Sequence, residues 1–218
     1  MAADPSPDEA IAPAGRAPGA ADGDGAARLR SETLYGVIGV VASAPDLDRV
    51  LDGVVDLLTE ATHCHACFVY LRDGDRLRLR AASRIYAHLV GHVEMGVDEG
   101  LAGWVARNGT PEFIREHALA DPRMKYVPEI EEERFQSMVA VPIPARSGSA
   151  LGTVVLHTEA PREFDEGVLN FLSHTASLVA GAIENARASR LLLGAAATPD
   201  ASRYVLRTAA GSGRAPTA

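Results

Sequence analysis

The segment His-Cys-His-Ala-Cys at residues 63–67 holds the densest set of chemically active side chains in the sequence. It contains both cysteines of the chain, Cys64 and Cys67, in Cys-x-x-Cys spacing beside His63 and His65. Thiolate and imidazole groups are common ligands of zinc and iron, and two thiols at this spacing can also form a redox pair. The segment therefore has three interpretations: a metal site, a redox pair, or structural residues at the end of a helix.

Spacing favours the structural interpretation of this segment. Five consecutive residues cannot easily supply four tetrahedral ligands, and no second Cys or His cluster completes the set. Free cysteines often behave as small buried hydrophobic residues. We expect Cys64 and Cys67 to be packed, His65 to be exposed, and His63 to end the helix at a positive φ. Metal and redox chemistry remain the alternatives.

Composition restricts the classes of partner. The 218-residue chain has a formal net charge of −8 and a single lysine, Lys125, which disfavours nucleic acid and anionic membranes as partners. Two cysteines cannot build a disulfide framework. The longest nearly apolar stretch, residues 34–44, is too short to span a bilayer, and the N-terminus has no signal-peptide pattern. We expect a cytoplasmic protein without nucleic-acid or membrane partners.

The chain divides into one folded region and two tails. Residues 1–26 are rich in Ala, Pro and Gly, so they bury too little apolar surface to offset the entropy of ordering. We expect a disordered N-terminal tail over 1–26, a folded domain over 27–193, and a mostly disordered C-terminal tail over 194–218.

Apolar periodicity within the folded region predicts helices and hairpins. Asp46 follows the breaker Pro45 and can cap a helix, and Asn108-Gly109 is typical of a helix end. The charged segment 116–136 is a long loop, which is usually functional or mobile in a compact domain. The predicted order is helix 28–44, helix 47–62, hairpin 66–83, a short helix before 108, loop 116–136, hairpin 137–158 and helix 164–193. Strands joined by hairpins indicate an antiparallel sheet, and therefore an α+β fold.

In this order, several stretches resemble the GAF family of sensor domains. They are ACFVYLRD, GLAGWVARNGTP, ADPRM, ERFQSMVAVPI, ALGTVVLHT, PREFDEGVLNFL and AGAIENARASRLL, which together cover roughly residues 45–190. The resemblance implies a central antiparallel sheet of five or six strands with long terminal helices on one face. On the other face, it implies a short helix and a loop, over 99–135, that roof a small-molecule pocket. It also implies dimerisation through the terminal helices.

Several ligand classes of the family lack their residues in this chain. Phe164 is followed directly by Asp165 and Glu166, unlike the spaced acidic signature of cyclic-nucleotide binders. The predicted roof has no cysteine for a bilin, and no cysteine follows Cys67 as in the sulfoxide-reductase branch. His117 lies where some haem-binding members carry their iron ligand, so haem or a metal stays a minor alternative. The cofactor is unknown, and we expect no covalent one.

Ligand pockets are concave and mostly apolar, with few polar groups. The aromatic and apolar residues around the expected roof, together with a histidine of a central strand, are therefore the candidate ligand-binding residues. They are Tyr86, Trp104, Phe113, Tyr126, Phe135, Met138 and His157. Core packing is the alternative for each of them, above all for Trp104. No catalytic residues are assigned, because no nucleophile, base or carboxylate pair has a supporting context.

These observations predict a GAF-like sensor or regulatory module that binds an unknown small molecule. It would signal through its terminal helices to a separate effector protein, such as a kinase or a transcription regulator. The apolar stripe on the last helix predicts a homodimer. A ligand-free dimerisation or docking module is one alternative, and a haem- or metal-binding redox sensor, with His63, Cys64, His65, Cys67 and His117 as candidate ligands, is the other.

Overall fold

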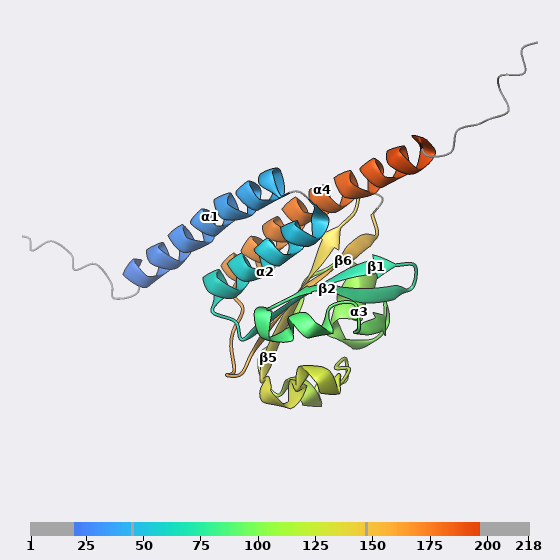
Figure 1. Ribbon diagram of the computed structural model, residues 1–218. Coiled ribbons are helices and arrows are strands. Elements are labelled where there is room, and N and C mark those ends of the chain that lie inside the picture. The colour runs from blue at the N-terminus through green and yellow to red at the C-terminus, as the bar shows by residue number, and fades with distance from the viewer. Residues whose placement is uncertain (1–19, 45, 147, 197–218) are drawn as a thin grey trace, which may run out of the picture.

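The computed structural model describes residues 20–44, 46–146 and 148–196 (Figure 1). Four α-helices are present in these residues: α1 (Ala20–Ser43), α2 (Leu47–Thr62), α3 (Gly100–Asn108) and α4 (Glu166–Ala196). The tails predicted over 1–26 and 194–218 lie mostly outside the described residues. Where they overlap, the chain is helical, because α1 begins at Ala20 and α4 continues to Ala196.

Six antiparallel strands form a single sheet in the order β3-β2-β1-β6-β5-β4. Their bounds are β1 (Ala66–Asp73), β2 (Arg76–Ala82), β3 (Glu94–Gly96), β4 (Glu112–Ile114), β5 (Ser137–Pro144) and β6 (Ala150–Thr158). The two predicted hairpins are confirmed as β1–β2 and β5–β6, and β6 joins them by pairing with β1. The predicted α+β class and the antiparallel sheet are therefore confirmed.

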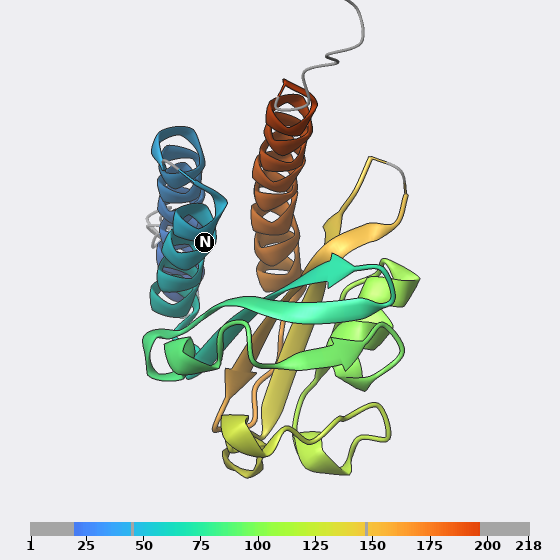
Figure 2. The same ribbon diagram turned by 45° about the vertical axis from the view of Figure 1, so that its right-hand side comes forward.

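Helices α1, α2 and α4 lie on one side of the sheet (Figures 1 and 2). Helix α2 begins at the predicted cap, where Asp46 accepts a hydrogen bond of 2.9 Å from the Arg49 N–H. The apolar face of α2 packs into a core with the helix-facing residues of β1, β5 and β6. The residues that α2 contributes to this core are Val50, Leu51, Val54, Val55 and Leu58.

The apolar stripe of α4 packs against the chain's own sheet. Val168, Leu172, Val179 and Ile183 are buried in the same core as α2, and Thr175 is fully buried. The homodimer is predicted both from this stripe and from the resemblance to the GAF family. Because the stripe is already covered within one chain, it does not support a dimer.

The opposite side of the sheet carries α3 and a series of short turns (Figure 2). The segment 116–136, expected as a loop, contains three 3₁₀ helices: η2 (Ala118–Ala120), η3 (Pro128–Ile130) and η4 (Glu132–Arg134). Another, η1 (Arg84–Leu89), precedes β3. We call α3 together with residues 115–135 the roof. It encloses a second apolar core, separate from the first, between itself and the sheet.

Candidate functional site

The His-Cys-His-Ala-Cys segment forms the turn from α2 into β1. His63 ends α2 with φ 50° and ψ 36°, the left-handed conformation expected from the sequence. Cys64 and Cys67 are buried in the helix-side core. His65 is exposed, and its Nδ1 accepts a hydrogen bond of 3.2 Å from the Glu159 N–H. The predicted packing of Cys64 and Cys67, the exposure of His65 and the left-handed backbone of His63 are confirmed.

Burial also makes these thiols unreactive. It raises the pKa of Cys64 above its usual range and raises that of Cys67 further, so both thiols stay protonated, and the thiolate is the form that attacks or binds a metal. His117 lies exposed on the roof at φ 54°, outside the apolar core. Among residues 20–44, 46–146 and 148–196, no three His, Cys, Asp or Glu side chains are grouped as a metal site requires.

A small cavity lies between the sheet and the roof. Its volume is about 10 Å³, which is at the lower limit of what one water molecule occupies. The lining combines three methionines with four polar side chains. The full set is Tyr70, Met95, Gly100, Leu101, Ala102, Met124, Lys125, Glu132, Met138, Val155 and His157.

His157 is the most unusual side chain of this cavity. It is 2% exposed and lies between two rings, with centroids 5.3 Å from Phe68 and 4.9 Å from Phe135. Its Nδ1 has no hydrogen-bond partner among the described residues. Burial lowers the pKa of His157 to about 3, so the imidazole is neutral at pH 7. A buried polar atom without a partner is rare in native proteins and needs an explanation.

A second unpartnered atom lies on the same strand. Thr153 and His157 are four residues apart on β6, so both side chains project from the roof-facing side of the sheet. Thr153 is fully buried, and its Oγ1 also has no hydrogen-bond partner within the described part of the chain. Its neighbour across the β1–β6 pair is Tyr70, which lines the cavity. This face of the sheet thus presents hydrogen-bonding groups that the folded chain leaves unused.

Glu132 places a carboxyl group at the same cavity. It is 4% exposed, and its Oε2 accepts a hydrogen bond of 2.6 Å from the Val127 N–H. Burial raises the pKa of Glu132 to about 7, although the hydrogen bond from Val127 stabilises the carboxylate and acts in the opposite direction. The cavity therefore holds a carboxyl group that is about half protonated at neutral pH beside a neutral imidazole.

We expect Glu132→Gln to stabilise the protein at pH 8 by about 2 kcal/mol, because it removes a buried negative charge. The folded carboxyl binds its proton up to about pH 7, whereas the unfolded one releases it near its ordinary value of 4.5. Wild-type stability therefore falls as the pH rises through this window, so the advantage of the variant should vanish near pH 4.5. Urea denaturation at both pH values measures it, with the exposed Glu129→Gln as control. An equal gain at both pH values would contradict this account.

An ion pair spans the edge of the cavity. Lys125 of the roof pairs with Glu99, the residue that precedes α3. The same Glu99 carboxylate accepts a hydrogen bond of 2.7 Å from the Gly96 N–H of β3. These contacts lower the pKa of Glu99, with the Gly96 hydrogen bond as the largest cause and Lys125 as the next. The pair joins the roof, α3 and the edge strand at one point.

Of the seven predicted ligand-binding residues, Met138 and His157 line the cavity. Phe135 and Tyr86 are buried in the roof-side core, where Phe135 contacts the cavity residue His157 and Tyr86 contacts Phe68 with ring centroids 5.2 Å apart. Trp104 is half-buried on α3 and has the Arg123 guanidinium 6.0 Å from its ring centroid. Trp104 therefore packs at the margin of the roof.

Two predicted residues lie elsewhere. Phe113 pairs with Val139 across β4 and β5, and directly opposed residues share one face of a sheet. Val139 belongs to the helix-side core, so Phe113 points away from the roof and packs against that core. Tyr126 is 51% exposed, and its hydroxyl donates a hydrogen bond of 3.0 Å to Glu133. Neither residue lines the cavity.

The sequence interpretation missed most of the polar lining. Tyr70 lies two residues after Phe68 on β1, so the two side chains project from the same face of the strand. This spacing could have placed Tyr70 on the roof side. Glu132 carries no such signal, because it stands between two other glutamates, Glu131 and Glu133. Lys125 was noted only for its charge.

The GAF domain family matches residues 44–184 of the chain. A curated protein described as phosphoenolpyruvate-dependent phosphotransferase system, from Salmonella typhimurium, is 32% identical over 160 residues, which are 72% of this chain and 21% of that protein. The Nif-specific regulatory protein of Azospirillum lipoferum is 28% identical over 154 residues, 67% of this chain and 24% of that protein. The chain thus spans about a fifth to a quarter of the length of these relatives.

Solved structures with the same fold include GAF domains. The GAF domain from a phosphoenolpyruvate-protein phosphotransferase of Coxiella burnetii superposes with a TM-score of 0.70 at 28% identity, over 76% of this chain and 98% of that one. Free methionine-R-sulfoxide reductase from Neisseria meningitidis superposes with a TM-score of 0.63 at 22% identity, over 75% of this chain and 93% of that one. The second likeness concerns the fold alone.

Proposed function

The chain belongs to the GAF domain family, and we propose that it is a regulatory module that binds a small molecule between its sheet and its roof. The observation that carries this proposal is the unpartnered Nδ1 of His157, fully enclosed beside Tyr70, Glu132 and Met138. An unpaired buried polar atom costs about 1–3 kcal/mol. A ligand that supplies the missing hydrogen bond removes that cost. The free energy recovered contributes to the affinity of the site for the ligand.

The lining defines the chemistry of the proposed ligand. Three methionine side chains favour an apolar body of adaptable shape. The neutral imidazole of His157 offers one donor and one acceptor, so the ligand carries a hydrogen-bonding group at that end. Glu132 disfavours an anion. We propose an uncharged or cationic small molecule with one polar end.

Binding requires the roof to open, because the cavity is far smaller than a ligand. Apart from α3, the roof consists mainly of short 3₁₀ turns and irregular segments. Such segments have few regular backbone hydrogen bonds and open at low cost in free energy. Lys125 and Met124 are half-buried at its edge. We propose that the Lys125–Glu99 pair holds the closed state, and that the ligand favours an open one by its differential affinity.

Output would pass through the terminal helices to another protein. Relatives that share this region include a phosphotransferase-system protein and a Nif-specific regulatory protein, which supports a regulatory role. The proposal includes an effector such as a kinase or a transcription regulator. It also includes a homodimer, a cytoplasmic location and the absence of catalysis. No described helix is long and apolar enough to cross a membrane.

One observation favours a different function. Side chains nearly fill the cavity, as expected of a ligand-free dimerisation or docking module. In that case the unpartnered atoms of His157 and Thr153 would be a cost of the fold without a binding role. The haem or metal sensor receives no support, because Cys64 and Cys67 are enclosed in the helix-side core and His117 is exposed outside the roof-side core.

A thermal-shift screen separates the two functions. Wild-type protein and His157→Leu are screened against one library of uncharged and cationic metabolites at pH 7.5. The proposal expects at least one compound that raises the Tm of the wild type with a saturable dose response and leaves His157→Leu unchanged. No stabilised wild type across the library would favour the ligand-free module, and equal stabilisation of both proteins would contradict a ligand held by His157.

A further inference from the structure

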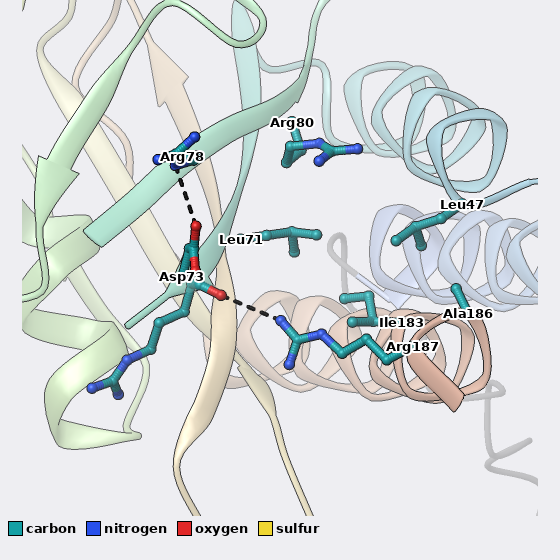
Figure 3. Close-up of a pocket in the computed structure, with 9 residues that line it drawn as sticks. Leu47, Leu71, Asp73, Arg78, Arg80, Ile183, Ala186 and Arg187 are labelled. Atoms are coloured by element: carbon teal, nitrogen blue, oxygen red, sulfur yellow. Dashed lines mark hydrogen bonds and ion pairs between the residues drawn. The ribbon is translucent and has the colours of Figure 1, made fainter. Parts of the chain in front are cut away.

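We infer that the helix side of the sheet carries a second binding site, for a small organic anion with an apolar body. The site is a hollow of about 280 Å³ between the β1–β2 hairpin, the start of α2 and the second half of α4 (Figure 3). It lies on the opposite side of the sheet from the roof. It is independent of the function proposed above.

The charge of this hollow is opposite to that of the chain. Its lining contains four arginines and one acidic residue, Asp73, in a protein with a formal net charge of −8. Two of the arginines, Arg78 and Arg80, alternate on β2 with Leu77 and Leu79, which are buried on the roof side. The helix-facing side of β2 is therefore cationic, where a fully covered sheet would be apolar.

Arg187 is the cation with the least compensation. Its guanidinium donates a hydrogen bond of 3.2 Å to the carbonyl oxygen of Arg72 (Figure 3). Within the described residues, no carboxylate lies within ion-pair distance of it. By contrast, Arg80 pairs with Asp48 at 2.5 Å, and Arg78 lies 3.6 Å from Asp73. A guanidinium with free donors is suited to a carboxylate or phosphate, which it can bind through two parallel hydrogen bonds.

The floor of the hollow is apolar. Leu47, Leu71 and Ile183 lie between Arg80 on one side and Arg187 on the other (Figure 3). Leu71 is 8% exposed and Ile183 is fully buried, so this floor is fixed by the core beneath it. An inorganic ion would leave the half-buried Leu47 side chain uncovered. An anion with a short aliphatic or aromatic body would cover it.

Size and position complete the assignment. A volume of about 280 Å³ is slightly below the usual range for drug-sized ligands, so the ligand is the size of a small metabolite. The lining joins the first residue of α2 to Arg187 of α4 through the hairpin. An anion bound there would connect the two helices that flank the sheet and would restrain the far half of α4.

The test is titration of the full-length chain at low salt with phenyl phosphate, benzoate and inorganic phosphate, followed by calorimetry and by methyl NMR of Leu71 and Ile183. We expect saturable binding of phenyl phosphate or benzoate, with shifts at both methyl groups and weaker binding of inorganic phosphate. Arg187→Gln should weaken binding about tenfold, because it removes a charge-assisted hydrogen bond. Arg107→Gln, an exposed arginine of α3, should leave it unchanged.

Three outcomes would overturn the assignment. They are no saturable binding of either organic probe, equal affinity in Arg187→Gln and the wild type, and equal affinity for inorganic phosphate and phenyl phosphate. If neither organic probe binds but an acidic peptide does, the occupant of the hollow is a protein partner and not a small anion. Because Arg187 is exposed, the variant should keep the wild-type circular dichroism spectrum and Tm, so lost binding reports the site.

Discussion

Gly152→Ala should lower the free energy of unfolding by about 3 kcal/mol or more, because a methyl group has no room at this position. Gly152 lies on β6, one of the two central strands of the sheet. A Cβ atom there would be 2.0 Å from the carbonyl oxygen of Tyr70 and 3.0 Å from the Cα of Leu71. Both atoms belong to the backbone of β1, so relief requires the two central strands to separate.

Urea denaturation followed by circular dichroism measures this loss. Gly181→Ala is the matched control, because nothing lies within 4 Å of a Cβ atom at that position of α4. Alanine in a helix interior is more favourable than glycine by about 1 kcal/mol, so the control should gain stability. A loss below about 1 kcal/mol in Gly152→Ala would show that the pairing of β1 and β6 is looser than described.

His157→Leu should stabilise the protein, and the gain should increase as the pH falls. At pH 7 we expect about 1–2 kcal/mol, since leucine has a similar volume and leaves no polar atom unpaired. The pKa of His157 is about 3 in the folded state, against an ordinary value of 6.5. Below pH 6.5 the unfolded chain binds a proton that the folded chain excludes, so wild-type stability falls with decreasing pH.

The difference between the two proteins isolates this effect, because Glu132 titrates in both. Each pH unit below 6.5 should widen the difference by about 1.4 kcal/mol, so it should reach about 4 kcal/mol at pH 4.5. Chemical denaturation at pH 7 and pH 4.5 measures it, with the exposed His92→Leu as control. A constant difference between the two pH values would mean that His157 is protonated within the fold.

Local patterns predicted the elements of this fold well. The apolar spacing of 47–62 and the position of Asp46 predicted α2 and its cap, and the flanking helix and strand identified Cys64 and Cys67 as packed residues. Strands β3 and β4 were missed, because three residues are too few for a periodic signal.

Long-range pairing limited what the sequence could say about the site. The side on which Phe113 projects depends on its pairing with Val139, which no local pattern contains. The burial of Glu132 among neighbouring glutamates depends on how the roof folds. The stripe of α4 was correctly identified as apolar, but periodicity alone does not distinguish packing on the chain's own sheet from packing on a second copy.

Native mass spectrometry tests most directly the central claim, that the roof pocket of this regulatory module binds a small molecule. Wild type and His157→Leu are compared as purified and after incubation with a metabolite extract of the expression host. We predict one non-covalent small molecule that is present on the wild-type chain, released on denaturation, and missing from His157→Leu, whatever anion the two proteins both bind at the Arg187 hollow. The bare protein mass for the wild type under both conditions, or an identical set of adducts on the two proteins, would contradict the account.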